Sequence, residues 1–250
     1  MARRSFKVGI VGLQPGRSWA ARAHVPALRA LPQDFDIAGV ANTSRESAEA
    51  AAKACELPRA YENVAELVGD PAIDIVAVTV KVPHHRQIVA AALNAGKHVY
   101  CEWPLGRTLE EAEEMAALAQ KAGVLAVCGT QARVAPEIVH LRRLIAEGAV
   151  GTVLSTAIVG TSAGWAGTIP ERKTSAYLLD RGTGATMLTI PFGHMLAAFR
   201  DVLGDMDRVH AVLATRRPTA RALDTRQSEG IQIRSFQLAI ERSSRATPTM

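Results

Sequence analysis

The sequence predicts an α/β protein whose first half is a doubly wound parallel sheet and whose second half is a smaller α+β domain. In residues 6–129, five short apolar runs rich in β-branched residues alternate with runs of helical periodicity. The apolar runs are almost continuously hydrophobic, which is typical of strands buried on both faces of a parallel sheet. Strands and helices in alternation imply right-handed crossovers, and hence a doubly wound sheet.

Five strands and four helices are predicted in the first half. The strands are FKVGIVG (6–12), FDIAGVA (35–41), IDIVAVTV (73–80), HVYCE (98–102) and VLAVCG (124–129), and the helices are 18–31, 44–55, 84–96 and 108–123. Pro26 is expected to bend or break the first helix, because a proline nitrogen has no hydrogen to donate. Ser44 is the expected N-cap of the second helix. Thr108 and Glu111 predict a capping box at the start of the fourth.

After residue 130 this alternation is lost, and we predict a first domain of residues 1–130 and a second of 131–250. The second domain is expected to contain a helix over 135–151, one long strand over 152–165, a helix over 184–204 interrupted near Pro191, a strand over 208–214 and a last candidate strand over 231–240. A twisted sheet that packs helices on one face generally needs more than two strands, and the tail offers only the candidate over 231–240. The second domain is therefore expected to be truncated or divergent at its C-terminus.

The composition predicts a globular cytoplasmic protein without a nucleic-acid or membrane partner. Hydrophobic residues make up 48% and charged residues 21% of the chain. The net charge of +5 is concentrated after Thr215, where seven arginines face three acidic residues. A basic tail without interleaved aromatic residues and without a recognition helix does not indicate direct nucleic-acid binding. No apolar run approaches the roughly 20 residues of a membrane span, and the N-terminal apolar run is too short for a secretory signal.

Neither a disulfide framework nor a metal site is expected. Cys55, Cys101 and Cys128 stand far apart without a C-x-x-C pair, so each is expected to act as a small hydrophobic residue. His84 and His85 are adjacent, so their side chains diverge, and no acidic residue stands nearby to complete a set of metal ligands.

The first strand leads into GIVGLQPGRSWAARAH, a corner that resembles a dinucleotide-binding turn. Such a site needs glycines for a tight turn and for close approach of backbone N–H groups to the pyrophosphate at a helix N-terminus. Gly12 and Gly16 supply part of this pattern. Gln14 replaces the usual second glycine, and Arg17 takes the position of the third. Because the corner follows the first strand of a βαβ unit, we favour a Rossmann-type NAD(P) site over a purely structural turn.

The end of the second strand predicts NADP(H), with NAD(H) as the alternative. An NAD site usually places an acidic residue there to bind the ribose 2′-hydroxyl. This chain has Asn42, Thr43, Ser44 and Arg45 instead. Two hydroxyls and a guanidinium suit a 2′-phosphate, which arginine binds in a bidentate manner. The other interpretation is that Ser44 only caps the next helix and that Arg45 is solvated.

The run VTVKVPHHRQIVAAALNAGKHVYCEWPLGRTLEEA resembles the glucose–fructose oxidoreductase, inositol dehydrogenase and rhizopine-catabolism (Gfo/Idh/MocA) family of sugar oxidoreductases. In that family a strand leads to a histidine, then to A-G-K-H-V and then to E-K-P. The matching histidine here is His85, and Glu102-Trp103-Pro104 replaces E-K-P. Val80, His85, Glu102 and Trp103 are accordingly the cofactor-binding candidates of this run.

Within the family, the chain is most similar to the branch typified by the fungal galactose-regulon repressor, an NADP-binding regulator. The shared features are the G-L-x-x-x-x-x-W-A start, the E-W pair, the G-W pair Gly164-Trp165, and F-G-H at Phe192-Gly193-His194. The resemblance implies a sugar-like ligand held between the two domains over the nicotinamide. It also implies subunit pairing through the sheet of the second domain, and hence a homo-oligomer if that domain is complete.

His194 is the candidate acid–base residue. The family lysine of E-K-P assists removal of the hydroxyl proton, but Trp103 stands in its place and an indole cannot accept a proton. The family also has a later Asp-x-x-x-His motif, of which His194 is kept while Thr189 lies near the position of the aspartate. An imidazole suits proton transfer at neutral pH, although a helix histidine that only packs is the alternative. Trp103 and Trp165 are candidates for stacking on the nicotinamide or a sugar ring, or for packing in the core.

Two functions follow from these observations. The first is an NADP-dependent oxidoreductase that acts on a sugar or polyol, with His194 as acid–base residue. The second is a non-catalytic NADP-binding regulator that presents the same cleft to a protein partner, as the loss of the family lysine would allow. We favour the enzyme, because catalysis is the commoner use of this architecture.

Overall fold

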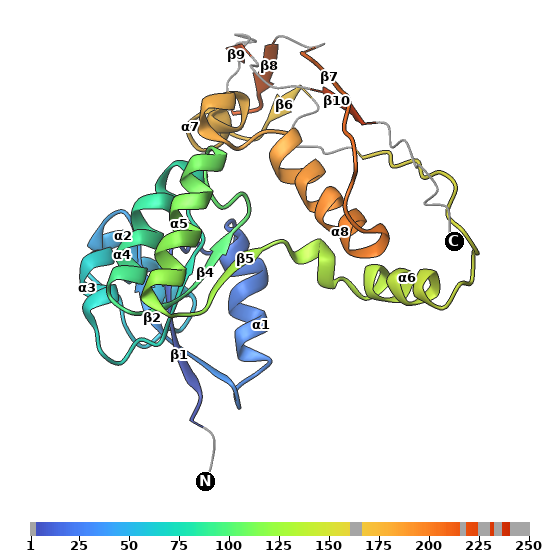
Figure 1. The fold of residues 1–250 in the computed structure, drawn as a ribbon. Coiled ribbons are helices and arrows are strands. Elements are labelled where there is room, and N and C mark those ends of the chain that lie inside the picture. The colour runs from blue at the N-terminus through green and yellow to red at the C-terminus, as the bar shows by residue number, and fades with distance from the viewer. Residues whose placement is uncertain (1–3, 161–166, 216–218, 225–230, 233–236, 241–250) are drawn as a thin grey trace. The chain divides into compact units, whose positions relative to one another are not determined.

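The computed structural model describes residues 4–160, 167–215, 219–224, 231–232 and 237–240. The chain divides into two compact units, Met1–Gly129 and Thr130–Met250 (Figure 1). Gly164 and Trp165, two residues of the motifs above, lie outside the described residues.

The first unit contains the predicted parallel sheet. Its strands are β1 (Phe6–Val11), β2 (Phe35–Ala41), β3 (Ile75–Val78), β4 (His98–Glu102) and β5 (Ala126–Gly129). All neighbours run parallel in the order β2-β1-β3-β4-β5. The chain moves outward from β1 to β2 and then returns to the other side of β1 as β3. The sheet therefore has a switch point between β1 and β3, and ligands of open α/β sheets bind at such a point, beyond the carboxyl ends of the strands.

Helices cover both faces of this sheet. They are η1, a π-helix (Ala20–His24), α1 (Val25–Arg29), α2 (Arg45–Ala54), α3 (Val64–Gly69), η2, a 3₁₀ turn (Val82–His84), α4 (His85–Asn94) and α5 (Leu109–Ala122). Buried residues form one cluster with α3, α4 and α5 on the face of Val76, and another with α1 and α2 on the face of Ala77. Adjacent strand residues point to opposite faces, so both faces of the central strands are buried. The predicted doubly wound architecture is confirmed.

Three local features differ from the expectations. Pro26 is the second residue of α1, which follows the π-helix directly. The helix predicted over 18–31 is therefore not broken by an irregular segment but changes from a π-helix to an α-helix just before Pro26. At α5, Thr108 Oγ1 accepts from Glu111 N–H as predicted, but the Glu111 carboxylate accepts from the Arg107 N–H, one residue before the cap. Helix α3, which Asn63 caps, was not predicted.

Strand β5 corrects the expectation that all five strands are buried on both faces. Ala126 and Val127 are exposed on β5, one of the two edge strands, whereas β2 at the other edge is largely buried. An open apolar groove of about 360 Å³ runs between β5 and α5, with Cys101 and Cys128 among its lining residues. Burial raises the pKa of the Cys128 thiol to about 11, so the thiol stays protonated at neutral pH and behaves as a small apolar group.

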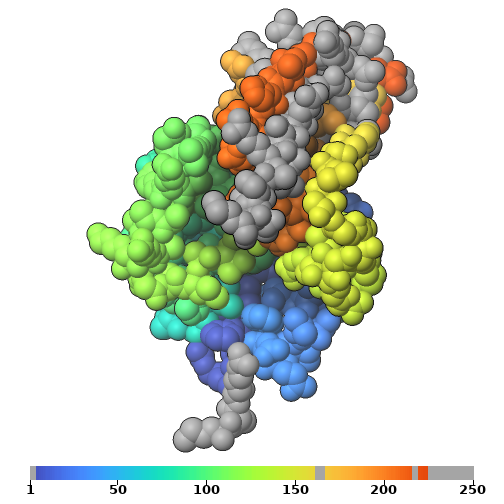
Figure 2. Space-filling model, turned by 45° about the vertical axis from the view of Figure 1, so that its right-hand side comes forward, coloured from blue at the N-terminus to red at the C-terminus, as the bar shows by residue number. Residues whose placement is uncertain are grey.

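The second unit combines helices with short strands. Its elements are η3 (Gln131–Val134), α6 (Pro136–Ala146), β6 (Thr168–Ile169), α7 (Arg172–Ser175), η5 (Ala176–Leu179), η6 (Arg181–Thr183), the π-helix η7 (Leu188–Phe192), α8 (Gly193–Leu203), β7 (Ala211–Ala214), β8 (Thr219–Ala222), β9 (Ile231–Gln232) and β10 (Gln237–Ile240). Strand β8 lies between β6 and β9, and β7 pairs with β10. An ion pair of 2.8 Å between Arg133 and Asp201 joins η3 to α8. Helix α6, in yellow-green in Figure 2, lies at the surface and buries none of its residues.

The predicted strand over 152–165 is wrong in its described part. Residues 152–160 form no regular secondary structure, and Leu154 and Val159 are 80% and 91% exposed. A β-branched run becomes a strand only where a neighbouring strand satisfies its N–H and C=O groups. No strand among the described residues pairs with this segment. The interruption near Pro191 is confirmed as the π-helix that precedes α8.

Candidate functional site

The first strand ends in a glycine whose backbone lies against the end of β3. Gly12 has a φ of 98°, a conformation that favours glycine. A Cβ atom at Gly12 would lie 2.6 Å from Cγ1 of Val80, far inside carbon–carbon contact distance. Thr79, the residue before Val80, donates its hydroxyl to the carbonyl oxygens of Val11 and Gly12 at 3.0 and 2.8 Å. Gly12 and Val80, predicted from two separate motifs, are thus brought together at the switch point of the sheet.

Asn42, at the end of β2, holds the loop after β1 through its side-chain amide. Its Oδ1 accepts from the Leu13 N–H at 2.9 Å, and its Nδ2 donates to the carbonyl oxygens of Leu13 and Ser47 at 2.9 and 3.0 Å. An aspartate could not make the two donor contacts, because a carboxylate only accepts. The absence of an acid here therefore has a local structural cause in addition to any role in cofactor choice. Thr43, the next residue, is exposed.

The loop after β1 is a tight turn that exposes the predicted phosphate-binding residues. The Gln14 carbonyl oxygen accepts from the N–H groups of Arg17 at 3.3 Å and Ser18 at 3.0 Å. The Gln14 N–H in turn donates to Ser18 Oγ at 3.0 Å. Gln14, Gly16 and Arg17 are exposed on this turn, and Gly16 has a φ of 70°. The three residues lie together beyond the carboxyl end of β1, where a pyrophosphate is bound in dinucleotide sites.

Ser44 and Arg45 have structural roles at the start of α2. Ser44 Oγ accepts from the Ser47 N–H at 3.2 Å, and the Ser47 side chain completes a capping box. Arg45 is half exposed and pairs with Glu49 at 2.7 Å and with Glu62 at 3.1 Å. A 2′-phosphate at this position would compete with these two carboxylates for the guanidinium.

His85 connects the loops that follow β3 and β4. It is fully buried; its Nε2 lies 3.0 Å from the Val80 carbonyl oxygen, and its Nδ1 lies 2.9 Å from that of Pro104 and 3.3 Å from that of Leu105. Burial lowers the pKa of His85, although the surrounding carbonyl oxygens favour the protonated ring. His85 therefore acts through the backbone, by fixing the segments on either side of the site.

Glu102 and Trp103 stand at the end of β4, and the structure adds a residue that sequence reasoning missed. Glu102 is the last residue of β4, and a cis peptide joins Trp103 to Pro104. His24, from the π-helix after β1, forms a hydrogen bond through Nε2 with Oε1 of Glu102. Its ring meets Tyr100 edge-on, with centroids 5.1 Å apart. The two partners are 78 residues apart in sequence, so no local pattern could have connected them.

The residues at this edge of the sheet fit a dinucleotide. The predicted cofactor residues of the first unit follow β1, β2, β3 and β4, and the carboxyl ends of parallel strands share one edge. Val80 occupies the space that a Cβ at Gly12 would need, so a residue without a side chain is required at this corner. The exposed turn Gln14–Arg17 would hold the phosphates, and the Asn42–Arg45 segment the adenosine ribose.

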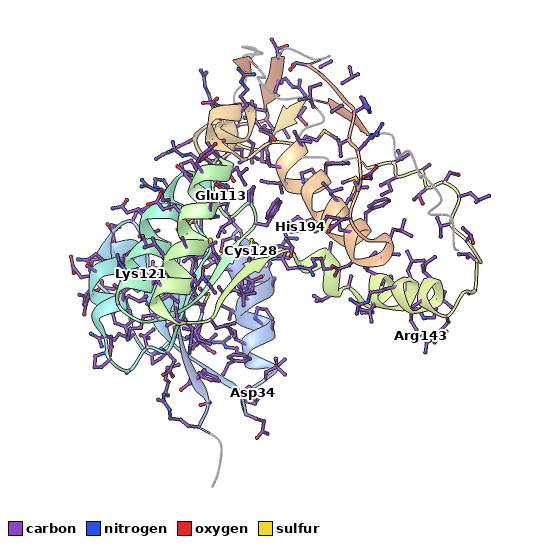
Figure 3. The ribbon with its side chains drawn as sticks, viewed as in Figure 1. Asp34, Glu113, Lys121, Cys128, Arg143 and His194 are labelled. Atoms are coloured by element: carbon purple, nitrogen blue, oxygen red, sulfur yellow. The ribbon has the colours of Figure 1, made fainter. Side chains whose placement is uncertain are left out.

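His194 belongs to the second unit, where it is the second residue of α8 (Figure 3). It is half buried and follows the π-helix that contains Pro191. Thr189, near the position of the family aspartate, accepts from the Thr186 N–H at 2.8 Å and donates to the Gly184 carbonyl oxygen at 2.5 Å. The hydroxyl therefore stabilises the turn that leads into α8 and supplies no carboxylate.

The described residues contain neither a membrane-spanning helix nor a cluster of metal-ligating side chains. None of the described helices is long and apolar enough to cross a bilayer. No group of three or more His, Cys, Asp or Glu side chains in this part of the chain is placed to hold a metal ion.

Comparison with known proteins gives matches for both units. The model of the oxidoreductase family with an NAD-binding Rossmann fold, Gfo/Idh/MocA, matches residues 6–130. The model of the Gal80p C-terminal domain matches residues 136–236. The two models together match nearly all of the first unit and most of the second.

Individual relatives include enzymes and a regulator. The dehydrogenase aclE of Aspergillus oryzae is 34% identical over 230 residues, which cover 90% of this chain and 62% of that protein. A 1,5-anhydro-D-fructose reductase of Ensifer adhaerens is 36% identical over 153 residues, or 60% of this chain and 44% of that one. The crystal structure of the transcriptional regulator Gal80p from Kluyveromyces lactis has a TM-score of 0.85 at 28% identity and covers 93% of this chain and 59% of that one.

The chain spans less than two thirds of the length of each of these relatives. Its first unit matches the family model over the whole of the sheet and over the loops that carry the predicted cofactor residues. The chain belongs to the Gfo/Idh/MocA family of oxidoreductases, with an NAD-binding Rossmann fold followed by a domain like the C-terminal domain of Gal80p.

Proposed function

We propose that the protein binds NADP(H) and acts as an oxidoreductase on a sugar or polyol. The observation that carries the proposal is the corner at Gly12, where the backbone of β1 meets Val80 at the switch point and the exposed turn Gln14–Arg17 follows. A bound nicotinamide supplies or accepts the hydride at C4. The relation to a dehydrogenase supports redox chemistry, and the relation to a 1,5-anhydro-D-fructose reductase supports a carbohydrate substrate.

The preference for NADP(H) over NAD(H) rests on the end of β2. Asn42 leaves no carboxylate to repel a 2′-phosphate, and the exposed Arg45 offers it a guanidinium. Against this, Glu49 and Glu62 already pair with Arg45, so part of the gained interaction is offset by loss of these ion pairs. Exposed ion pairs contribute little, so a doubly charged phosphate is expected to prevail.

We expect purified protein to bind NADPH more tightly than NADH, and Arg45→Gln to abolish most of that difference. Titration followed by nicotinamide fluorescence should show NADPH affinity falling about 3- to 10-fold in the variant while NADH affinity stays unchanged. Arg86→Gln is the matched control, because Arg86, on α4, is 53% exposed and pairs with Glu114 on α5. Equal affinities of the wild type for the two dinucleotides would contradict the proposed preference.

His194 is the proposed acid–base residue, placed at the start of α8 with a half-buried imidazole. With saturating NADP+ and a panel of sugars and polyols, His194→Ala is expected to lower kcat by a factor of about 10²–10⁴. His140→Ala is the control, since His140 is exposed on α6. Unchanged turnover in His194→Ala would show that another group moves the proton.

A second candidate function is a non-catalytic NADP-binding regulator. Two observations favour it: Trp103 stands where the family has its lysine, and the second unit matches the Gal80p C-terminal domain. A regulator of this kind would bind the dinucleotide but would turn over none of the sugars and polyols tested with NADP+. A protein partner retained from source lysate only in the presence of NADP(H) would then support regulation. The homo-oligomer and the cytoplasmic location stay predictions.

A further inference from the structure

His24 and Glu102 form a side-chain pair at the carboxyl edge of the sheet. His24 is the last residue of the π-helix that follows the glycine corner, and Glu102 is the last residue of β4. The two side chains are only 15% and 16% exposed, and Nε2 of His24 bonds to Oε1 of Glu102. The His24 ring also packs edge-on against Tyr100. The histidine is thus held on two sides, and it holds the carboxylate in turn.

The sheet order assigns this pair to one half of a bound dinucleotide. In such folds the adenosine ribose is bound at the end of β2 and the pyrophosphate at the turn after β1. Because β2 and β3 lie on opposite sides of β1, the remaining half extends toward the ends of β3 and β4. Glu102 ends β4, the neighbour of β3 in the sheet, and Val80 follows β3. The nicotinamide half is the part of the cofactor that the Glu102 carboxylate can reach.

A carboxylate in this place can accept hydrogen bonds from the hydroxyls of the nicotinamide ribose or from the carboxamide N–H₂. A glutamate side chain at a strand end has several rotamers, and fixing one of them only on binding lowers affinity. The bond from His24 selects the rotamer before the ligand arrives. The packing of the His24 ring on Tyr100 fixes the donor as well.

We propose that His24 is a positioning residue, which aligns the Glu102 carboxylate for the nicotinamide half of the dinucleotide. The proposal rests on the proposed function, because it needs a dinucleotide at this edge. His24 acts through Glu102 and contacts no reacting atom in this assignment. Its effect is expected on binding of the nicotinamide half and not on binding of the adenosine half.

The test compares two ligands on matched variants. His24→Phe keeps an aromatic ring against Tyr100 and removes the nitrogen that bonds to Glu102, whereas His24→Gln keeps a donor. The ligands are NADPH and adenosine 2′,5′-bisphosphate, which lacks the nicotinamide half. We expect His24→Phe to weaken NADPH binding about 5- to 10-fold and to leave the bisphosphate within twofold of wild type. His24→Gln should recover most of the loss.

A double-variant cycle tests whether the effect passes through Glu102. Glu102→Gln should weaken NADPH about as much as His24→Phe, and the double variant should be no weaker than either single one. Wild-type NADPH affinity in His24→Phe, or an equal loss of NADPH and the bisphosphate, would overturn the assignment alone. Failure of the wild type to bind either NADPH or NADH would overturn the proposed function and this assignment with it.

Discussion

Gly12→Ala is expected to lower the free energy of unfolding by about 2–4 kcal/mol and to weaken NADPH binding by more than about tenfold. The new Cβ would lie 2.6 Å from Val80 Cγ1 and 3.1 Å from the backbone of Thr79. Relief requires β1 and β3 to move apart at the switch point, or the turn after β1 to change conformation. Either change displaces the backbone that faces the ligand. Urea unfolding and NADPH titration measure the two effects.

Gly123→Ala is the control for backbone strain. Gly123 has a φ of 65° at the C-terminus of α5, and a Cβ there would meet no atom within 4 Å. Its substitution should lower the free energy of unfolding by about 1 kcal/mol, through conformational strain alone, and leave NADPH binding unchanged. If the two alanine variants behave alike, strain rather than close contact explains the glycine, and the corner is not a specific site.

His85→Leu is expected to destabilise the first unit by about 2–4 kcal/mol. The leucine fills a similar volume but has no N–H group to donate to the carbonyl oxygen of Val80 or of Pro104, which then lies buried against an apolar side chain. Since His85 fixes the segments on both sides of the site, the variant should also bind NADPH more weakly. Thermal unfolding, with and without NADPH, measures both consequences.

The same residue predicts a pH dependence of stability. Burial lowers the pKa of His85 in the folded protein below its ordinary value of about 6.5, so the unfolded chain binds the proton more readily. Stability is therefore lost as pH falls from about 6.5 toward the folded-state pKa. The slope over this interval should be smaller in His85→Leu than in the wild type. An equal slope in the two proteins would assign the acid sensitivity to other groups.

Local patterns were sufficient to predict the sheet, because each strand of the first unit is an apolar run bounded by turn or helix signals. They failed for residues 152–160, where the same composition forms no strand, since a strand needs a partner that a linear pattern cannot supply. They also missed α3, whose six residues are too few for a clear helical period. The exposure of β5 could not be predicted either, because it depends on strand order and on which elements cover each edge of the sheet: β2, at the other edge, is largely buried.

The residues of the candidate site also divide into those that a local sequence pattern reveals and those that only the fold brings together. Gly12, Gln14, Gly16 and Arg17 could be chosen from sequence because a phosphate-binding turn is a local structure. The amide of Asn42 is different, because its bonds to Leu13 cross from β2 to the loop after β1, and only the fold reveals them.

The sequence by itself determined the succession of the five strands in the first unit, the glycine corner and the family motifs, since all of these depend on residues close together in the chain. Tertiary structure decided which residues meet: Gly12 with Val80, His85 with two loops, and His24 with Glu102 across 78 positions. The physical reason is that hydrogen bonding and close packing act through space. The parallel sheet brings the ends of separate strands to one edge, and the chemistry of the site depends on that edge.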